Sequence, residues 1–518
     1  MRTRIPTVVA ALALCLGLAA CGSQTKSSGG AASTSDVLRI PYLADMSVPD
    51  PDVFYDVEGN SVILNTYQGL LRYAPDSTQI VGNLASSWTV SPDRLTYTFK
   101  LRPGVRFHDG TPLTSQAVKR SFERRTAVGQ APSYMLEPVA KMTTPDARTF
   151  VVRLRRRVAP FENYMASSWG PKIIGPDAIV THAGSDHGQT WLRTHADGTG
   201  PFELTAFDRG RQYVLTRNDA YRGPKPFFRE VRIKITPDIG SQRLQLQNGD
   251  LDAVTHSFPA SELASLPDSL RVLKEDSFLQ LMLYVNTNKA PFSDPAVRRG
   301  LRSTIDIPAL VAQAYSGTAT PAAGPYPAQL LSDQPKLPYA PDPAKASAAA
   351  AKASTKTITL AYTSDESGVQ RRVSELLGGS LKAAGYDVTL REVQLPQVYG
   401  YVKHLDKAPD LLLSTNTPDG AHPDLWARIL FSSKGGLNFL GFSDHKLDAL
   451  LDEAYGADRA QADQLYRQAG QRFVDGDGLF FLGAVKDVLV LRKDLTGIEH
   501  VLAYPWTIDY GTLRRGAS

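Results

Sequence analysis

The sequence contains almost no cysteine: its 518 residues include two, Cys15 and Cys21. Cys15 lies in a segment that we expect to be removed, as described below, which leaves Cys21 alone in the mature chain. A single cysteine forms neither an intramolecular disulfide nor a thiolate metal cluster. The sequence therefore excludes dithiol redox chemistry and a disulfide-stapled scaffold.

A strong excess of charge of one sign is also lacking. The chain has 57 basic and 52 acidic side chains, a net charge of +5 at pH 7 with neutral histidines, whereas a nucleic-acid binder normally concentrates basic residues on one face. Arg153, Arg155 and Arg157 alternate along an extended segment, so at period two they fall on one side of a strand. We interpret them as a solvated sheet face and expect no nucleic-acid partner.

Motifs of catalysis are absent from the sequence. It has no Gly-x-Ser-x-Gly nucleophile elbow, no His-Glu-x-x-His zinc helix and no Gly-x-x-x-x-Gly-Lys phosphate loop. His182, His187 and His195 form the densest histidine group, but their spacings do not place the imidazoles on one helical face. We therefore predict no catalytic residue, no metal site and no cofactor.

Long hydrophobic runs are limited to the N-terminus, where Arg2 and Arg4 precede an uncharged run from Thr7 to Ala20. This run is shorter than the roughly 20 residues that cross a membrane as a helix, and no comparable run follows. Its pattern predicts a secretory signal over residues 1–20. The mature chain is therefore expected to have no spanning helix.

The segment after this run suggests how the chain is held at a membrane. Leu18–Cys21 resembles the lipobox of bacterial lipoproteins, which implies that Cys21 is acylated and anchors the chain to the cell membrane. The alternative is an ordinary cleaved signal that a cysteine happens to follow. Residues 22–35 are small and polar, so we predict that residues 21–35 comprise the lipidated cysteine and a flexible linker.

The rest of the chain has the composition of a globular protein, with 42% hydrophobic and 21% charged residues, and its length suggests about three domains. Two alternating runs around a Ser-Pro-Asp turn predict a β-hairpin over Trp88–Leu101. Strand, amphipathic helix and strand patterns follow one another at Thr357–Tyr362, Val369–Ala384 and Asp387–Val393. This order predicts a parallel crossover unit and an α/β fold.

Several local motifs resemble the extracytoplasmic solute-binding proteins of family 5, the peptide and nickel class that serves ABC importers. They occur in the family's order at Tyr67–Leu70, Leu84–Trp88, Tyr97–Gly110, Gly198–Phe202, Asn218, Tyr221, Asn248–Asp252, Asn286, Pro291–Phe292, Val297–Arg299 and Ile305–Asp306. Their glycines and prolines fix turns and their apolar residues fill a core, so they identify the fold and not the ligand.

The resemblance implies a two-lobed α/β fold of the type II periplasmic-binding-protein kind, with three domains and a hinge between the lobes. By analogy, lobe I takes residues 36–80, 199–285 and 488–518, a domain inserted in lobe I takes 81–198, and lobe II takes 286–487. In such proteins the solute lies between the lobes, and its contacts with both favour the closed arrangement.

The function implied is that of a lipid-anchored solute-binding component of an ABC importer, most simply for oligopeptides, with separate permease and ATPase subunits as partners. The chain itself is expected to be a monomer and not an enzyme. Within the binding class, a nickel chelate, a sugar, an opine or glutathione remains an alternative solute. A surface hydrolase and an adhesion lipoprotein remain alternatives of other classes.

The predicted site centres on the loop after the strand at residues 410–414, which resembles a family loop whose aspartate binds a peptide's α-amino group. His422 stands where an acid is common, so Asp419 or Asp424 is expected to take this role. The alternative is that the loop only turns, with Asp424 capping a helix. Asn416 belongs to the same loop, and Trp426 either stacks on the ligand or anchors the loop.

Further ligand contacts are predicted outside this loop. Asn438 matches an asparagine that the family often places near the ligand. Gln280 and Met282 lie at period two on a strand that ends at Asn286, so both face the same side, which is either the ligand or the core. Met46 and Ser47 follow the first strand and complete the predicted set.

Overall fold

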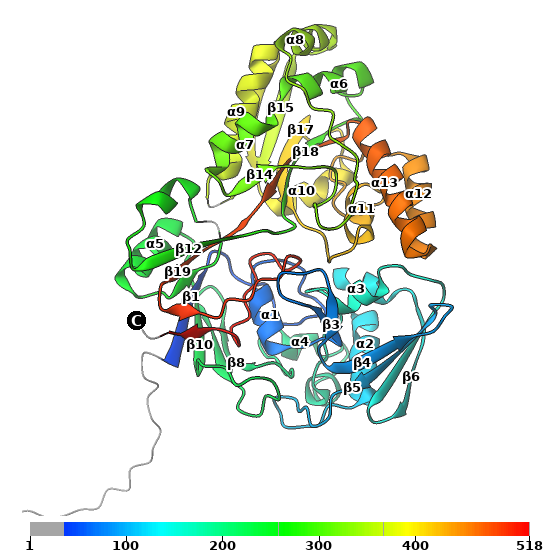
Figure 1. Cartoon of the computed structure of the whole chain (residues 1–518), viewed down its shortest axis with the longest axis vertical. Coiled ribbons are helices and arrows are strands. Elements are labelled where there is room, and N and C mark those ends of the chain that lie inside the picture. Colours follow the sequence, from blue (N-terminus) through cyan, green and yellow to red (C-terminus); the bar gives the residue numbers. More distant parts are fainter. Residues whose placement is uncertain (1–35, 257, 366, 517–518) are drawn as a thin grey trace, which may run out of the picture.

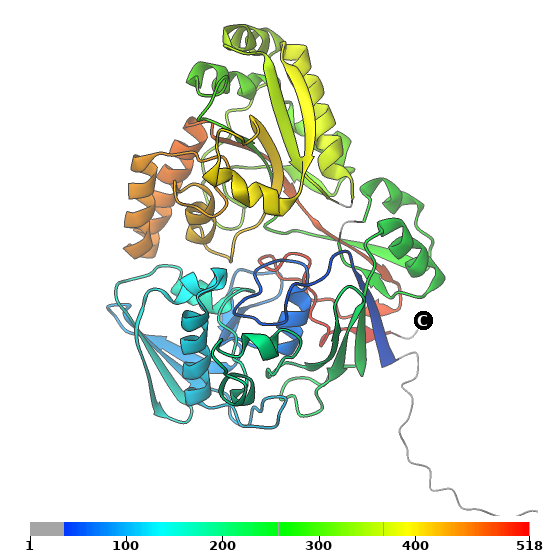
Figure 2. The same cartoon turned by 180° about the vertical axis from the view of Figure 1, so that it is seen from behind.

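The computed structural model describes residues 36–256, 258–365 and 367–516. The predicted signal over residues 1–20, the lipidation site Cys21 and the linker to residue 35 lie outside the described residues. Figure 1 shows two lobes, one above the other, and Figure 2 shows them from behind. No helix within the described ranges combines the length and the apolar character needed to cross a membrane.

The lower lobe is built on two four-stranded sheets. The first has the order β1-β10-β9-β8, in which β1 and β10 are parallel and the other pairs are antiparallel. The second, antiparallel, has the order β4-β5-β7-β6, and helix α2 packs against β6 and β7. The strands of the two sheets are β1 (Val37–Tyr42), β10 (Glu230–Ile235), β9 (Gln212–Arg217), β8 (Phe202–Asp208), β4 (Ala85–Val90), β5 (Thr96–Leu101), β7 (Thr149–Leu154) and β6 (Val139–Asp146).

Short elements complete the lower lobe and link its two sheets. They are α1 (Asn60–Thr66), β2 (Leu71–Tyr73), β3 (Ile80–Gly82), α2 (Ser115–Val128), the 3-10 helix η2 (Ala131–Leu136), α3 (Phe161–Ala166), the π-helical turn η3 (Asp177–Thr181), α4 (Gln189–Leu192), β20 (Leu495–Thr496) and β21 (Arg514–Arg515). The second sheet lies within the range predicted for the inserted domain.

The upper lobe is built on one six-stranded sheet of mixed direction. Its strands, in spatial order, are β14 (Ala319–Pro321), β18 (Leu479–Val485), β13 (Gln280–Val285), β17 (Leu411–Asn416), β15 (Thr357–Thr363) and β16 (Asp387–Val393). One face is covered by α6 (Pro295–Thr304), α7 (Ile307–Tyr315), α8 (Pro343–Lys352) and α9 (Val369–Ala384), the other by α10 (Leu395–Gly400), η5 (Tyr401–Lys403), α11 (Asp424–Leu430), α12 (His445–Gly456) and α13 (Arg459–Asp475).

Strand β13 shows how the sequence places the two cores of this sheet. Leu281, Leu283 and Val285 pack into the apolar cluster beneath α7 and α9. Met282 and Tyr284 point the opposite way, into the cluster that contains α11 and α13 and continues into the lower lobe. The period-two alternation predicted for this strand is therefore observed, with both faces buried.

The lobes are joined by two chain segments on one side of the molecule (Figure 1). Strands β11 (Ala253–Val254), β19 (Asp487–Arg492) and β12 (Leu270–Glu275) form a small sheet beside α5 (Ile239–Asn248) and η4 (Ala260–Ser265). Strand β12 continues into β13 through residues 276–279, and β18 continues into β19 through residue 486.

These connections correct one predicted boundary. The prediction assigned β13 to lobe I, whereas β13 pairs with β17 and β18 in the sheet of the upper lobe. The boundary therefore lies near residues 276–279 and not at 286. A short strand that is apolar along its whole length fits a buried sheet in either lobe, so its sequence does not indicate which one.

The local predictions agree closely with the structure. Strands β4 and β5 form the predicted hairpin. Strand β15, helix α9 and strand β16 form the predicted crossover, with β15 and β16 parallel. Helix α9 ends at Ala384, and Gly385 caps it with a left-handed φ of 109° that glycine adopts without steric cost.

Candidate functional site

The loop between β17 and α11 carries Asp419 to the boundary between the lobes. The Oδ2 atom of Asp419 accepts hydrogen bonds from the Tyr55 hydroxyl at 2.6 Å and from the Tyr134 hydroxyl at 2.5 Å. Tyr55 belongs to the loop after β1 and Tyr134 to η2, so both donors come from the lower lobe. A carboxylate of the upper lobe is therefore held by two elements of the lower one.

The electrostatics of Asp419 are unusual for a carboxylate. Its exposed fraction is 5%, and no ion pair to Lys or Arg is formed by this side chain with any described residue. Burial raises the pKa of the Asp419 carboxyl above its ordinary value, although the hydrogen bonds from Tyr134 and Tyr55 lower it in part. Its second oxygen, Oδ1, receives no hydrogen bond from the described residues. The arrangement suits an incoming cation that donates hydrogen bonds.

Other contacts hold the lobes together around Asp419. The Ser167 hydroxyl donates to the Asp419 carbonyl oxygen at 2.5 Å, and the backbone N–H of Ala421 donates to the Tyr73 hydroxyl at 2.8 Å. The hydroxyls of Tyr164 in α3 and Tyr455 in α12 lie 3.2 Å apart. The lobes are therefore in contact in this structure, in the closed arrangement.

Two half-exposed aromatic side chains lie on either side of this contact. Tyr55, 40% exposed, packs edge-on against Trp169 in the lower lobe with ring centroids 5.7 Å apart. Tyr399 in α10, 51% exposed, packs edge-on against Phe439 in the upper lobe at 5.5 Å. Burial raises the pKa of Tyr399, and the charges of Asp56 and Asp419 raise it further. Each lobe thus presents a half-exposed aromatic ring, and the ring of the lower lobe, Tyr55, bonds Asp419 directly.

The structure gives Asp424 a different position from Asp419. Its oxygens accept hydrogen bonds from Arg428 Nε at 3.1 Å and from the Tyr466 hydroxyl at 2.9 Å, so its charge is compensated within the upper lobe. The predicted alternative, that Asp424 caps a helix, is wrong. Asp424 is the first residue of α11, and its backbone N–H donates to Nδ1 of His422 at 3.1 Å.

His422 is therefore the residue that satisfies the N-terminus of α11. Burial lowers the pKa of His422 to about 4, which keeps its ring neutral and its Nδ1 able to accept a hydrogen bond at neutral pH. Its ring packs edge-on against Tyr466 with centroids 5.8 Å apart. His422 and Asp424 thus shape the loop that presents Asp419.

Trp426 and Asn438 are buried inside the upper lobe. The indole N–H of Trp426 donates to the Pro325 carbonyl at 2.8 Å, which fits the predicted anchoring role. The Asn438 amide donates to the carbonyl of Phe442 at 2.6 Å and accepts from its backbone N–H at 2.9 Å. Both side chains brace segments next to α11, and neither forms a hydrogen bond with Asp419.

Gln280 and Asn416 face each other at the ends of β13 and β17. The Asn416 amide donates to the Tyr284 hydroxyl at 3.0 Å. The Gln280 side chain is 2% exposed and forms no hydrogen bond with the described residues, so its amide has bonding capacity left. Met282, on the same face, is buried in the core. Polar groups thus occupy the end of this sheet face and apolar ones its centre.

Met46 and Ser47 lie in the loop after β1. The backbone N–H of Met46 donates to the Tyr213 hydroxyl at 2.8 Å. The Met46 side chain fills the space above Gly59, where a Cβ would lie 2.7 Å from Met46 Cγ. Met46 therefore belongs to the core, while Ser47 is exposed.

Sequence reasoning missed Tyr55, Tyr134 and Tyr399. Asp419 is separated from Tyr55 by 364 residues and from Tyr134 by 285. No motif marks these tyrosines, so only the fold brings them together. A cavity of about 570 Å³ lies elsewhere, within the lower lobe beside Arg72, Arg102 and Arg222, and none of the predicted site residues lines it.

Comparison with known proteins supports the two-lobed architecture. Residues 79–438 match the family described as bacterial extracellular solute-binding proteins, family 5. The chain is 32% identical over 479 residues to a probable D,D-dipeptide-binding periplasmic protein of Escherichia coli, covering 90% of this chain and 92% of the relative. It is 27% identical over 463 residues to a glutathione-binding protein of Pectobacterium atrosepticum, covering 86% and 88%.

Solved structures share the fold at lower identity. A periplasmic binding protein of Helicobacter pylori in complex with the peptide STSA superposes with a TM-score of 0.80 at 22% identity, covering 92% of this chain and 98% of that one. A protein of Brucella suis in complex with Fe(III)-EDTA superposes with a TM-score of 0.82 at 21% identity, covering 93% and 100%. The predicted type II binding-protein fold is thereby confirmed.

Proposed function

Because the chain belongs to family 5 of the bacterial extracellular solute-binding proteins, we propose that it captures short peptides between its lobes and delivers them to the permease of an ABC importer. Members of this family are binding proteins that act outside the cytoplasm, and the chain is not an enzyme. The single observation that supports a peptide ligand is Asp419, a buried carboxylate at the boundary between the lobes without a cation of its own.

The α-ammonium group of a peptide supplies the positively charged partner that Asp419 lacks among the described residues. It is a cation with three N–H donors, and Asp419 Oδ1 has acceptor capacity left. The hydroxyl oxygens of Tyr55 and Tyr134 are able to accept the remaining N–H groups while their O–H groups still donate to Oδ2. The bound ammonium then contacts both lobes, so the closed arrangement binds it better than the open one.

The other predicted residues fall into two groups in this proposal, those that contact the ligand and those that support the site. The amide of Gln280 is free to bond a peptide group, and Asn416 lies opposite it with its amide on Tyr284. Tyr55 and Tyr399 offer aromatic surface for side chains of the ligand. Ser47 stays a predicted contact of the lower lobe. We assign a supporting role to six residues, namely Met46, Met282, His422, Asp424, Trp426 and Asn438.

The test uses the purified full chain and a mixture of short peptides, half of them acetylated at the amino terminus. Glutathione, a nickel–histidine complex and simple sugars are added as competitors. After removal of unbound material, mass spectrometry of the released ligand is expected to recover intact peptides with a free amino terminus. Recovery of hydrolysed peptides, or of one of the competitors alone, contradicts the proposal.

We also propose that the chain is a lipoprotein anchored through Cys21, as the lipobox-like Leu18–Cys21 suggests. Mass spectrometry of the N-terminal peptide from the membrane fraction is expected to show acylated Cys21 at the mature N-terminus. The Cys21→Ser variant is expected to leave the membrane fraction. An unmodified cysteine, or a variant that stays with the membrane, contradicts the anchor and leaves the ligand proposal untouched.

A further inference from the structure

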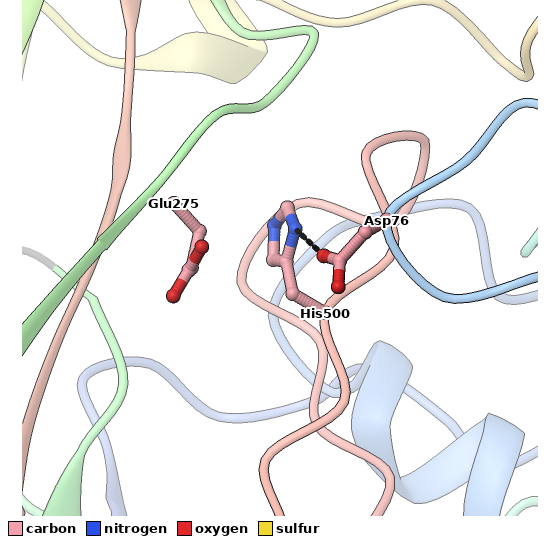
Figure 3. A group of neighbouring side chains, drawn as sticks. All are labelled: Asp76, Glu275 and His500. Atoms are coloured by element: carbon pink, nitrogen blue, oxygen red, sulfur yellow. Dashed lines mark ion pairs between the residues drawn. The ribbon is translucent and has the colours of Figure 1, made fainter.

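A second polar cluster lies at the base of the two segments that connect the lobes. Figure 3 shows His500, in the C-terminal loop, between Asp76 of the β2–β3 loop and Glu275, the last residue of β12. One nitrogen or oxygen atom from each of the three side chains lies within 4.8 Å of the other two. The Nδ1 atom of His500 is 3.8 Å from Oδ1 of Asp76. A backbone hydrogen bond of 2.9 Å from Asp76 N–H to the His500 carbonyl holds the two loops together.

A fourth residue, Asp487, orients the imidazole from the other side. Asp487 is the first residue of β19, lies opposite Glu275 in the strand ladder and is buried. Its Oδ2 lies 3.3 Å from Nε2 of His500 and accepts the backbone N–H of Trp506 at 3.0 Å. A carboxylate that receives one ring N–H leaves the other ring nitrogen available as a ligand, which is the usual arrangement around histidines that bind metals.

The cluster has more negative charge than the chain compensates. Asp76, Glu275 and Asp487 surround one imidazole, and none of the three carboxylates forms an ion pair with Lys or Arg among the described residues. Lys486, the neighbouring base, pairs with Asp276. The second oxygen of Asp487, Oδ1, is buried and has no hydrogen-bond partner among the described residues. A buried carboxylate with an unpartnered oxygen and no Lys or Arg beside it is costly, so positive charge on or next to the His500 ring is favoured.

We propose that Asp76, Glu275 and His500 bind a divalent transition-metal ion of the Zn²⁺ class, with Asp487 as the residue that positions His500. One imidazole nitrogen and two carboxylate oxygens form a donor set that suits such ions, whereas Mg²⁺ and Ca²⁺ prefer oxygen ligands alone. Ligand bonds of about 2.0–2.2 Å require the three donor atoms to draw together by about 1 Å. Asp76, whose side chain is 76% exposed in a loop, is free to make this movement.

The proposed ion links parts of the molecule that are distant in the sequence. Asp76 belongs to the lower lobe, Glu275 directly precedes the first connection between the lobes, and Asp487 directly follows the second. The ion therefore fixes the base of both connections to the lower lobe. The site shares no residue with the ligand site around Asp419, so either proposal stands or fails without the other.

The test is a calorimetric titration of the full chain, purified without a histidine tag and stripped with EDTA, with ZnCl₂. We expect one saturable site, and a higher melting temperature in the presence of Zn²⁺. Asp76→Asn and Glu275→Gln are each expected to weaken this binding at least about tenfold. Circular dichroism confirms that both variants are folded, which is expected because Asp76 is exposed and Glu275 is partly exposed.

A matched control comes from His182, whose Nε2 lies 3.6 Å from Asp177 Oδ2 and which belongs to no group of three potential metal ligands among the described residues. His182→Gln is expected to bind Zn²⁺ like the unmodified chain. The proposal is overturned if the unmodified chain shows no saturable binding, or if Asp76→Asn and Glu275→Gln retain its affinity. Loss of binding in His182→Gln also overturns it, because the ion then lies elsewhere.

Discussion

Asp419 and Asp424 are two buried acids of one short segment, and their surroundings differ in one respect. Asp424 is bound by the guanidinium of Arg428 as well as by the Tyr466 hydroxyl. Asp419 is bound by two tyrosine hydroxyls and by no cation of the described chain. The lower lobe follows the first pattern, since Asp50 and Asp52 pair with Arg124 inside it. These three acids, each inside one lobe, are thus paired with a cation of the chain, whereas Asp419, between the lobes, has neutral partners.

The difference teaches how a binding site is distinguished from a structural ion pair. Removing one partner of a buried pair leaves an uncompensated charge, which is destabilising. A carboxylate held by hydroxyls tolerates the exchange of its partners, because hydroxyl groups both donate and accept. We therefore expect changes at Asp419 to alter binding and changes at Asp424 to alter stability.

The largest effect is expected from Asp419→Asn, which removes the charge and keeps the volume. Truncating one partner of a desolvated charge pair costs about 2–5 kcal/mol, so the affinity for peptides with a free amino terminus is expected to fall by about 30-fold or more. Isothermal titration calorimetry measures the loss. Acetylated peptides serve as the control, since they have no ammonium to lose. Unchanged affinity for free peptides removes the proposed role of Asp419.

The Asp424→Asn variant tests the other half of the comparison. It leaves Arg428 with Asp452 and the Leu451 carbonyl, so the free energy of unfolding is expected to fall by about 1–3 kcal/mol. Urea denaturation measures this loss. Peptide affinity of the folded variant is expected to stay within about threefold, which corresponds to less than 1 kcal/mol. A larger loss of affinity without a loss of stability reverses the assignment of the two acids.

The dependence of peptide binding on pH is a further test of the difference between Asp419 and Asp424. The pKa of Asp419 is raised in the free protein, and a bound ammonium lowers it, so protons and ligand compete for the carboxylate. Affinity is expected to be full above the raised pKa and to fall as the pH drops through it, by up to about tenfold per pH unit. Titrations at a series of pH values measure the slope. The Asp419→Asn variant is expected to lack it, and an equal slope in that variant assigns the titration to another group.

The smallest effects are expected from single hydroxyls. Tyr134→Phe and Tyr55→Phe each remove one hydrogen bond to Asp419, for which about 0.5–1.5 kcal/mol is typical. We expect a loss of peptide affinity below about tenfold in each variant, with unfolding nearly unchanged. Tyr466→Phe is the matched variant at Asp424 and is expected to lower stability by a similar amount while binding is retained. Equal behaviour of the three variants in both assays contradicts the distinction between the two acids.

The sequence predicted the local structure well because local patterns determine it. The crossover of β15, α9 and β16 and the hairpin of β4 and β5 follow from apolar periodicity and turn residues within short segments. The prediction placed β13 in the wrong lobe. All of its residues are buried, and a buried strand fits the sheet of either lobe. Periodicity indicates which residues are buried but not against which part of the chain.

The candidate site was predictable only in part. The loop with Asp419 was found through its resemblance to a family loop, yet its partners Tyr55 and Tyr134 come from distant segments without a motif. The ion pair of Asp424 with Arg428 was predictable from the sequence, because opposite charges four residues apart on a helix attract each other. Which acid faces the other lobe depends on the direction in which the loop leaves β17, and this is a property of the whole fold.

The two connecting segments lie together on one side of the molecule (Figure 1), and this placement determines where the lobes separate most when they open. When the upper lobe swings about that side, a point travels farther the greater its distance from the pivot, as on a lever. Helices α3 and α12, which lie at the opposite side in Figure 1, therefore separate farther than the segments near the connections, and with them the hydroxyls of Tyr164 and Tyr455. An entrance that opens about residues 276–279 and 486 is therefore widest on the side away from these two segments.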